Sequence, residues 1–280
     1  MADVEETLQE ALALGDEGRW EEMAGLLAAA LRDSPDDPYV LCWLGVAEQE
    51  VGNEGAAYEY FRRALAEEPT DPQLLAMIGS GLAQFDDPEA ERALRTAAVA
   101  GPGIATTRLQ YGAYLAREGL FEEALEHLHA GIGLEPDNPV MHGELGTALA
   151  LKGDLRGAAD AMEQALELAP DDSWTRLLLG LIYVERGEGE TAAELLVQAA
   201  EERDHDAEAQ ILAALAAAAQ GWADAAEDII ARATYTAEGS DVELLNEAEE
   251  RVTAGAAEAL EMLHDQIGPS VLHERLTQPL

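Results

Sequence analysis

The stretch 139-PVMHGELGTALALKGDLRGAADAMEQALELAPDD-172 decides the fold of this chain. It holds two apolar, alanine-rich segments separated by Gly153 and Asp154, and a proline lies near its end. Similar segments lie on both sides of it, with a period of 34 residues or one fewer. Prolines and pairs of a large residue with glycine recur in phase: Pro35, Pro69, Pro102, Pro136 and Pro170; Leu44-Gly45, Ile78-Gly79, Tyr111-Gly112, Leu145-Gly146 and Leu179-Gly180. Such a period is typical of stacked helical units rather than of a single globule.

The pattern resembles the tetratricopeptide repeat, a helix-turn-helix unit of 34 residues. In residues 139–172 the resemblance runs over both helices: Leu145, Gly146, Leu149, Ala158, Met162, Ala165 and Pro170. It implies an all-α fold, a right-handed superhelical solenoid of stacked hairpins with a concave inner wall. The small residues have a physical reason, because antiparallel helices approach closely only where small side chains face the crossing.

The repeats divide the chain into two expected parts. Residues 1–240 are expected to hold about seven repeats: 4–37, 38–71, 72–104, 105–138, 139–172, 173–206 and 207–240. The third is one residue short, and Asp86-Asp87-Pro88 replaces its usual turn. Residues 241–280 are expected to form a C-terminal capping helix over 241–266, ended by Gly268-Pro269, and then a short tail.

The charge of the chain is strongly negative. Its 57 acidic residues outnumber the 16 basic ones, the formal net charge is −41, and Lys152 is the single lysine. This balance argues against nucleic acid and against anionic membrane surfaces as partners, since both need cationic contacts. The acids are spread over all repeats, which favours adaptation to molar cytoplasmic salt, where screening removes self-repulsion. A basic partner is the alternative.

Cysteine usage and the N-terminus indicate a compartment. Cys42 is the only cysteine, so the chain cannot form an internal disulfide and is compatible with a reducing environment. The first residues are acidic and lack the basic start and apolar run of a signal peptide. The longest apolar run, 212–219, is too short to span a bilayer. We therefore expect a cytoplasmic protein without membrane insertion.

The sequence offers little that resembles catalytic chemistry. His127 and His129 are two residues apart, which places them about 200° apart around a helix and not on one ligand face. Phosphate-binding loops, nucleophile elbows and metalloprotease motifs are absent from the sequence. With 57 acids, carboxylate pairs arise by chance. We therefore expect no enzymatic activity, no catalytic residue, no cofactor and no metal site.

The resemblance also implies which residues face the concave wall, because positions 2, 5, 9, 12 and 13 of each first helix point into the groove in this family. Here these positions are largely apolar: Tyr39, Val46, Leu109, Val140, Trp174, Leu177, Leu181, Ile211 and Leu215. An apolar strip on a charge-rich protein is typical of an interface. Two alternatives stay open: core and groove are exchanged by an error of helix phase, or the chain's own C-terminal helix occupies the wall.

The function that follows from these expectations is a non-enzymatic protein–protein interaction scaffold. It would bind a peptide or an amphipathic helix of a protein partner in its apolar groove. The first alternative is a structural protein that assembles into homo-oligomers through its repeats. The second is a regulatory subunit of an enzyme complex.

Overall fold

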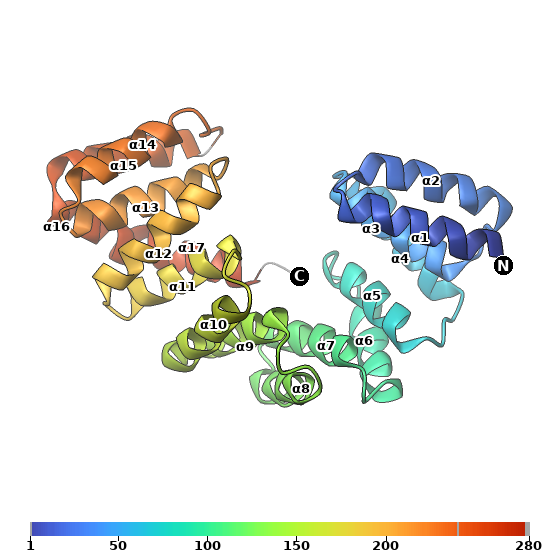
Figure 1. The fold of residues 1–280 in the computed structure, drawn as a ribbon. Helices are drawn as coiled ribbons and strands as arrows, with labels where there is room; N and C mark the ends of the chain where they lie inside the picture. Colours follow the sequence, from blue (N-terminus) through green and yellow to red (C-terminus); the bar gives the residue numbers. More distant parts are fainter. Residues whose placement is uncertain (1, 240, 278–280) are drawn as a thin grey trace. The chain divides into compact units, whose positions relative to one another are not determined.

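The computed structural model describes residues 2–239 and 241–277, and all regular structure within these ranges is helical (Figure 1). In this described part of the chain, consecutive helices pack in pairs as hairpins: α1 with α2, α3 with α4, α5 with α6, α9 with α10, α11 with α12, and α13 with α14. This confirms the predicted all-α fold of stacked helical hairpins. The expected boundary at residue 240 and the tail beyond 277 lie outside the described residues.

The packing divides the chain into two compact units. Among the described residues, unit 1 contains 2–118 and 126–134, and unit 2 contains 119–125, 135–239 and 241–277. Helix α8 is divided between them. The helices up to α8 are α1 (Ala2–Asp16), α2 (Trp20–Asp33), α3 (Pro38–Glu50), α4 (Glu54–Ala66), α5 (Pro72–Ala83), α6 (Glu89–Ala100), α7 (Ala105–Arg117) and α8 (Phe121–Leu134).

Unit 2 contains three further hairpins and a C-terminal segment. Its hairpins are α9 (Pro139–Lys152) with α10 (Leu155–Leu168), α11 (Ser173–Glu185) with α12 (Gly189–Glu202), and α13 (Ala207–Ala219) with α14 (Ala223–Ala233). The segment that follows consists of α15 (Asp241–Ala254), α16 (Ala256–Glu261), the π-helix η1 (Met262–Ile267) and α17 (Gly268–Thr277). One continuous apolar core joins hairpins and segment.

The glycines of the large-residue-plus-glycine pairs lie where the two helices of a hairpin cross. A Cβ atom on Gly146 would lie 2.5 Å from Cγ of Met162 and 3.1 Å from the carbonyl oxygen of Ala158. On Gly45 it would lie 2.8 Å from the ring of Phe61. Real side chains do not pack at such distances, so the crossing requires glycine. The small residues therefore set how closely each hairpin closes in both units.

A capping side chain fixes the start of five first helices: α3, α5, α9, α11 and α13. Asp37, Asp71, Asn138, Asp172 and Asp206 recur at nearly the repeat period, and each accepts hydrogen bonds from backbone N–H groups of the first turn. Such caps satisfy donors that have no partner inside the helix. The repeat thus specifies where these helices begin.

A second set of polar contacts ties each first helix to the loop before it. The residue at the fourth position donates to a backbone carbonyl six residues earlier. The pairs are Arg108 with Pro102, His142 with Pro136, Arg176 with Pro170, and Gln210 with Asp204. The sequence suggested a packing role for His142, and the structure shows a half-buried ring that also makes this hydrogen bond.

The short third repeat makes its turn differently from the others. Gly52 and Gly153, like the matching glycines of other repeats, have positive φ between the two helices of a hairpin. In the α5–α6 hairpin Asp86 takes this left-handed conformation, with φ of 52°. Asp87 follows it, and its buried carboxylate accepts from Tyr58 at 2.8 Å and from Arg62. The turn is thus held by side chains rather than by glycine.

The C-terminal segment differs from its prediction. The sequence indicated one helix over 241–266, ended by Gly268-Pro269 and followed by a tail. Instead, Gly255 breaks the first helix with φ of 131°, and helical structure continues from 256 to 277. Proline lacks the N–H that the preceding turn of an α-helix needs. The π-helical turn η1 lies directly before Gly268, and a Cβ on that glycine would meet the carbonyl of Leu263 at 2.4 Å.

Candidate functional site

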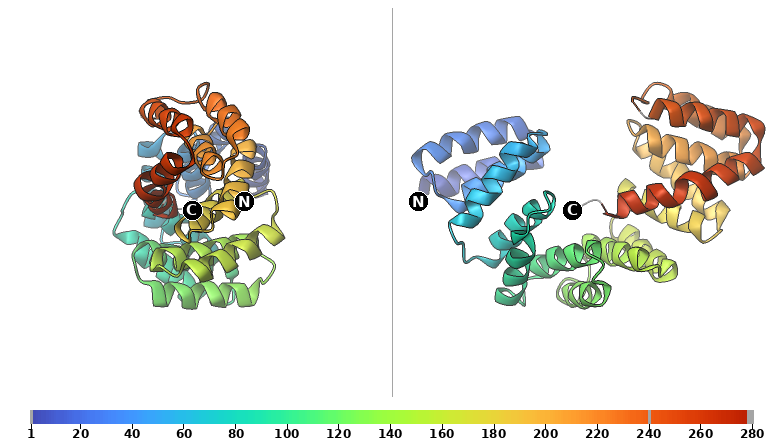
Figure 2. Two further views of the ribbon diagram at one scale, coloured as in Figure 1. Left: turned by 90° about the vertical axis from the view of Figure 1, so that its left-hand side faces the viewer. Right: turned by 180° about the vertical axis from the view of Figure 1, so that it is seen from behind.

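The candidate site is the face of unit 2 formed by groove positions of α11 and α13. We call Trp174, Leu177, Leu181, Ile211 and Leu215 the inner wall of unit 2. The C-terminal segment packs on this side: α17 on α11 and α9, and α16 and η1 on α13 (Figure 2). Four wall side chains are at most 1% exposed, and Trp174 is half-buried. The helices that carry the wall are thus packed against the C-terminal segment of the same chain: α11 against α17, and α13 against α16 and η1.

The apolar contribution of α17 to this packing comes from three side chains. Val271, Leu272 and Leu276 are 7%, 5% and 3% exposed and belong to the same apolar core as the wall. The intervening His273 and Glu274 are exposed. The helix is therefore amphipathic and turns its apolar side toward the core.

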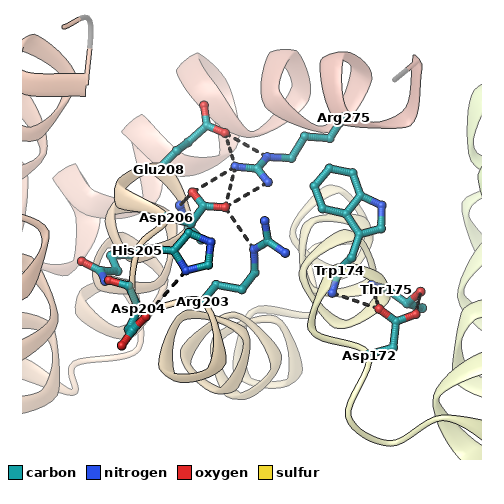
Figure 3. Close-up of polar contacts among 11 residues, drawn as sticks. Asp172, Trp174, Thr175, Arg203, Asp204, His205, Asp206, Glu208 and Arg275 are labelled. Atoms are coloured by element: carbon teal, nitrogen blue, oxygen red, sulfur yellow. Dashed lines mark hydrogen bonds and ion pairs between the residues drawn. The ribbon is translucent and has the colours of Figure 1, made fainter. Parts of the chain in front are cut away.

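A buried arginine of α17 lies at the centre of a cluster of charges (Figure 3). Arg275 donates from Nε and Nη2 to Glu208 at 2.9 and 2.5 Å, and from Nη1 and Nη2 to Asp206 at 3.3 Å. Arg203 donates to the same Asp206 carboxylate at 3.0 Å. Both Arg275 and Arg203 lie 5.3 Å from the ring centroid of Trp174. Cations attract the face of an indole ring, so Trp174 reinforces the cluster.

Asp206 has two roles in this cluster. It caps the start of α13 by accepting from the N–H of Ala209 at 2.9 Å, and it pairs with both arginines. Burial alone would raise the pKa of this carboxyl, but the N–H of Ala209 and the two guanidinium groups outweigh burial and lower the pKa. The carboxylate therefore stays ionised at neutral pH, as the pairing requires.

A cavity of about 610 Å³ lies between the repeats and the C-terminal segment. Val184 and Gln220 line it from the repeats, and Leu260, His264 and Asp265 from α16 and η1. Nearby, the buried Oε1 atom of Glu185 has no hydrogen-bond partner among the described residues. Burial raises the pKa of the Glu185 carboxyl, with a smaller opposing effect from His264. Packing is therefore less complete here than along α17.

The remaining predicted groove residues lie in more open surroundings or elsewhere in the core. Tyr39 and Val140 are 39% and 49% exposed, and Val46 is half-buried. The Tyr39 hydroxyl donates to Asp71 at 2.6 Å, and this bond, together with burial, raises the pKa of Tyr39 to about 12. Leu109 is only 7% exposed. The structure thus separates the nine residues into an open group and a covered group.

His127 of α8 packs against the neighbouring helix α7. The ring of His127 packs edge-on against Tyr111, with 4.8 Å between centroids, and accepts from Arg108 at 3.1 Å. In the described part of the chain, no three His, Cys, Asp or Glu side chains are grouped so that they could hold a metal ion. Helices long and apolar enough to cross a bilayer are likewise absent from the residues described.

Family models of the tetratricopeptide repeat match residues 8–72, 112–173 and 149–214, which together make up more than half of the chain. This chain is a tetratricopeptide repeat protein. Members of this family are generally scaffolds that bind proteins or peptides. A search among characterised protein sequences gave no significant match.

Solved structures share the fold of this tetratricopeptide repeat protein. The APC/C hetero-tetramer Cut9–Hcn1 contains a chain with a TM-score of 0.68 and 21% identity; the match covers 85% of our chain and 48% of that one. PilW, a type IV pilus biogenesis factor, matches with a TM-score of 0.60 and 22% identity. This match covers 70% of our chain and 91% of PilW. A thermophilic protein of the same family from Thermus thermophilus matches with a TM-score of 0.53 and 26% identity. This match covers 64% of our chain and 97% of that protein. The protein thus spans about half the length of the Cut9–Hcn1 chain that it matches.

Sequence reasoning missed the charged part of the site in this tetratricopeptide repeat protein. The period from Asp172 to Asp206 could have identified Asp206 as a helix cap. Glu208 occupies groove position 2, as Trp174 does in the previous repeat. The sequence could therefore have predicted that Glu208 lies beside the wall. Nothing in the repeats indicated Arg275, because it lies outside them. The apolar spacing of Val271, Leu272 and Leu276 was the only signal that residues near 275 form a helix.

Proposed function

We propose that this protein is a non-enzymatic scaffold that binds an amphipathic helix of a protein partner on the inner faces of its repeats. The observation that carries the proposal is the packing of α17 on α11. An amphipathic helix with buried aliphatic residues and an arginine is seated on groove positions of the repeats in this chain. A surface that accommodates its own helix in this way is suited to a partner's helix of similar chemistry.

The open groove positions supply the surface for such a partner. Leu12 and Tyr39 of unit 1 are each more than a third exposed, and they lie at positions 9 and 2 of their first helices. Apolar side chains on one face of a charge-rich unit are suited to contact with a partner. Apolar anchors surrounded by carboxylates favour a helix that combines aliphatic and basic residues.

The composition of the chain suits a salt-rich and reducing cytoplasm. The proposal places it in the cytoplasm of an organism with high internal salt, where screening allows a chain with 57 acids and 16 basic residues to stay compact. A single cysteine, Cys42, which is buried, suits a reducing compartment.

Site-specific photo-cross-linking in the source organism tests the scaffold. A photoreactive amino acid replaces Leu12 or Tyr39 at open groove positions of unit 1, and Val99 or Tyr235 as matched exposed controls, which are 76% and 90% exposed. We expect the two groove positions to give the same partner, cross-linked through an amphipathic helical segment identified by mass spectrometry. Equal capture from the control positions, or cross-links only to further copies of this chain, would refute the proposal.

A further inference from the structure

We propose that α17 is a replaceable occupant of the inner wall of unit 2, and that the partner helix that takes its place carries the same side-chain pattern. The pattern is two adjacent aliphatic residues, an arginine three residues after the second, and an aliphatic residue next to the arginine. The inference rests on the proposed scaffold function and adds the chemistry of the partner and the way the site is controlled.

The wall selects a helix of this kind through shape. Val271 and Leu272 lie one turn before Leu276, so the three side chains form one apolar stripe. All three are less than a tenth exposed, and they share one core with Leu177 and Leu181. A partner helix needs aliphatic side chains at the same spacing to fill the same volume.

The wall selects an arginine through charge. Glu208 and Asp206 both direct carboxylate oxygens at the Arg275 guanidinium, at 2.5 to 3.3 Å. Without Arg275 these two carboxylates would face each other with Arg203 alone to balance them. An arginine that binds between them regains the charged hydrogen bonds that Arg275 makes, and the face of Trp174 favours a planar guanidinium.

The segment that carries α17 is built so that it can detach. Gly255, with φ of 131°, separates it from α15 by a backbone conformation that side chains rarely adopt. Between this hinge and α17 lies the cavity of about 610 Å³ lined by Leu260 and His264. The buried oxygen of Glu185 beside it has no hydrogen-bond partner among the described residues. Ala259, Met262 and Leu263 of the segment are buried in the core, so release has to expose them; the hinge and this oxygen of Glu185 are the features that favour it.

Charge favours a partner over a second copy of this chain as the new occupant. Two copies with a net charge of −41 each repel one another, and exchange of α17 between them brings these charges together. A partner that is less acidic has no such barrier. An arginine-bearing helix is in addition attracted by the carboxylates of the repeats.

The experiment uses the full-length chain and a fluorescent peptide with the sequence of residues 256–277. Binding is measured by fluorescence anisotropy for the wild-type chain, Arg275→Glu, and the control Arg251→Glu, which makes the same charge change at an α15 residue paired with Glu247. Hydrogen exchange over 268–277 reports whether α17 has left the wall. Light scattering reports the oligomeric state.

We expect Arg275→Glu to release α17 and to bind the peptide at least about tenfold more tightly than the wild type, in which the tethered helix competes at a high effective concentration. Arg251→Glu should bind as the wild type does. Adding Glu208→Arg to Arg275→Glu re-forms an ion pair in reverse, so the double variant should close again and lose the peptide. A peptide with glutamate at the arginine position should not bind Arg275→Glu.

Several results would overturn the inference. If Arg275→Glu keeps α17 protected, the arginine does not hold the segment; if α17 is released but the peptide does not bind, the wall is not a helix site. If the wild type binds the peptide equally well, α17 does not control the site, although the scaffold function survives. Dimers formed by exchange would identify a second copy as the occupant. If Arg275→Glu does not fold, the Glu208→Arg variant is tested instead, with the peptide that carries glutamate at the arginine position. If both variants unfold, α17 is part of the core and the inference is wrong.

Discussion

Position 9 of the first helices differs in exposure between α1 and α3 of unit 1 and α11 and α13 of unit 2. Leu12 of α1 is 38% exposed and Val46 of α3 is half-buried, whereas Leu181 of α11 and Leu215 of α13 are at most 1% exposed. The hairpins of α3 and α11 have the same crossing glycine and the same kind of helix cap. The C-terminal segment packs on α11 and α13 and thus contributes to the burial there. Ala113, at position 9 of α7 in unit 1, is 3% exposed, so packing between repeats contributes as well.

The comparison teaches that a repeat position has no fixed environment. An apolar residue at position 9 is a surface residue where nothing covers it and a core residue where another helix does. Exchange of one helix is then sufficient to convert a stretch of core into a binding surface. The following predictions test how far this difference between the units extends.

The largest expected effect comes from a charge at position 9. Leu181→Asp in unit 2 places a carboxylate in the core and should lower the free energy of unfolding by more than about 3 kcal/mol. Leu12→Asp, the same change at the same position in unit 1, should alter it by roughly 0.5 kcal/mol or less, as exposed substitutions do. Urea unfolding followed by circular dichroism measures both. Equal losses would remove the distinction between an open and a covered face.

The next effect tests whether the hairpins of the two units are equivalent. Gly45→Ala in unit 1 and Gly146→Ala in unit 2 each add a methyl group where the hairpin has no room, at a cost of roughly 1–3 kcal/mol. Gly143→Ala is the control on α9, because its Cβ would only meet Thr175 at an ordinary 3.6 Å. The control should gain up to about 1 kcal/mol from helix propensity. The melting temperatures of Gly45→Ala and Gly146→Ala should both fall below that of the control. If Gly45→Ala kept the wild-type melting temperature, the hairpins of the two units would differ in their packing as well.

Salt should stabilise α17 less than it stabilises the rest of the chain. Screening reduces the self-repulsion of a net charge of −41, so the melting temperature should rise from low to molar KCl, by roughly 2–4 °C for each kcal/mol gained. The ion pairs of Arg275 are screened as well, so hydrogen-exchange protection of 268–277 should rise less than that of α3 and α5. A melting temperature that does not change with salt would contradict salt adaptation. An equal rise of protection in 268–277, α3 and α5 would show that the ion pairs of Arg275 contribute little to holding α17 in place.

The smallest expected effect is a dependence on acid at the cluster of charges. The folded pKa of Asp206 is lowered, so its contribution is present above its ordinary pKa and is lost as the pH falls through the lowered value. The fluorescence of Trp174, with the other three tryptophans replaced by phenylalanine, should follow this loss. Arg275→Gln should weaken the dependence. An unchanged acid transition in Arg275→Gln would mean that the helix cap, not the ion pair, determines it.

The repeats made most of the fold predictable, because their rules are local. Gly146 and Ala158 recur in phase, and the structure places both at a hairpin crossing. Asp86 takes the left-handed turn in the short repeat, where the sequence predicted an unusual turn without its conformation. The C-terminal segment was predicted wrongly because a Gly-Pro pair usually ends a helix. Here a π-helical turn precedes Gly268-Pro269, and the chain stays helical to Thr277.

The candidate site was predictable only in part, for a different physical reason. Position within the repeat identified Trp174 and Leu177 as residues of one face, since that depends on helix geometry. Whether the face is open depends on contacts across long stretches of chain, such as Arg275 with Glu208, which no local pattern encodes. The sequence alone therefore left the open groove and the helix-filled wall as alternatives.

The distance in sequence between Arg275 and its acidic partners has a consequence for the order of folding. Each hairpin closes from residues that are close together in the chain, whereas Arg275 meets Asp206 across 69 residues and Glu208 across 67. Local contacts form fast, and a chain made from its N-terminus folds its early parts first. Asp206 and Glu208 are therefore synthesised well before the helix that neutralises them. If the repeats fold as they are made, α11 and α13 can be in place before α17 is available to pack on them, and in the proposed scheme a partner helix could bind during that interval.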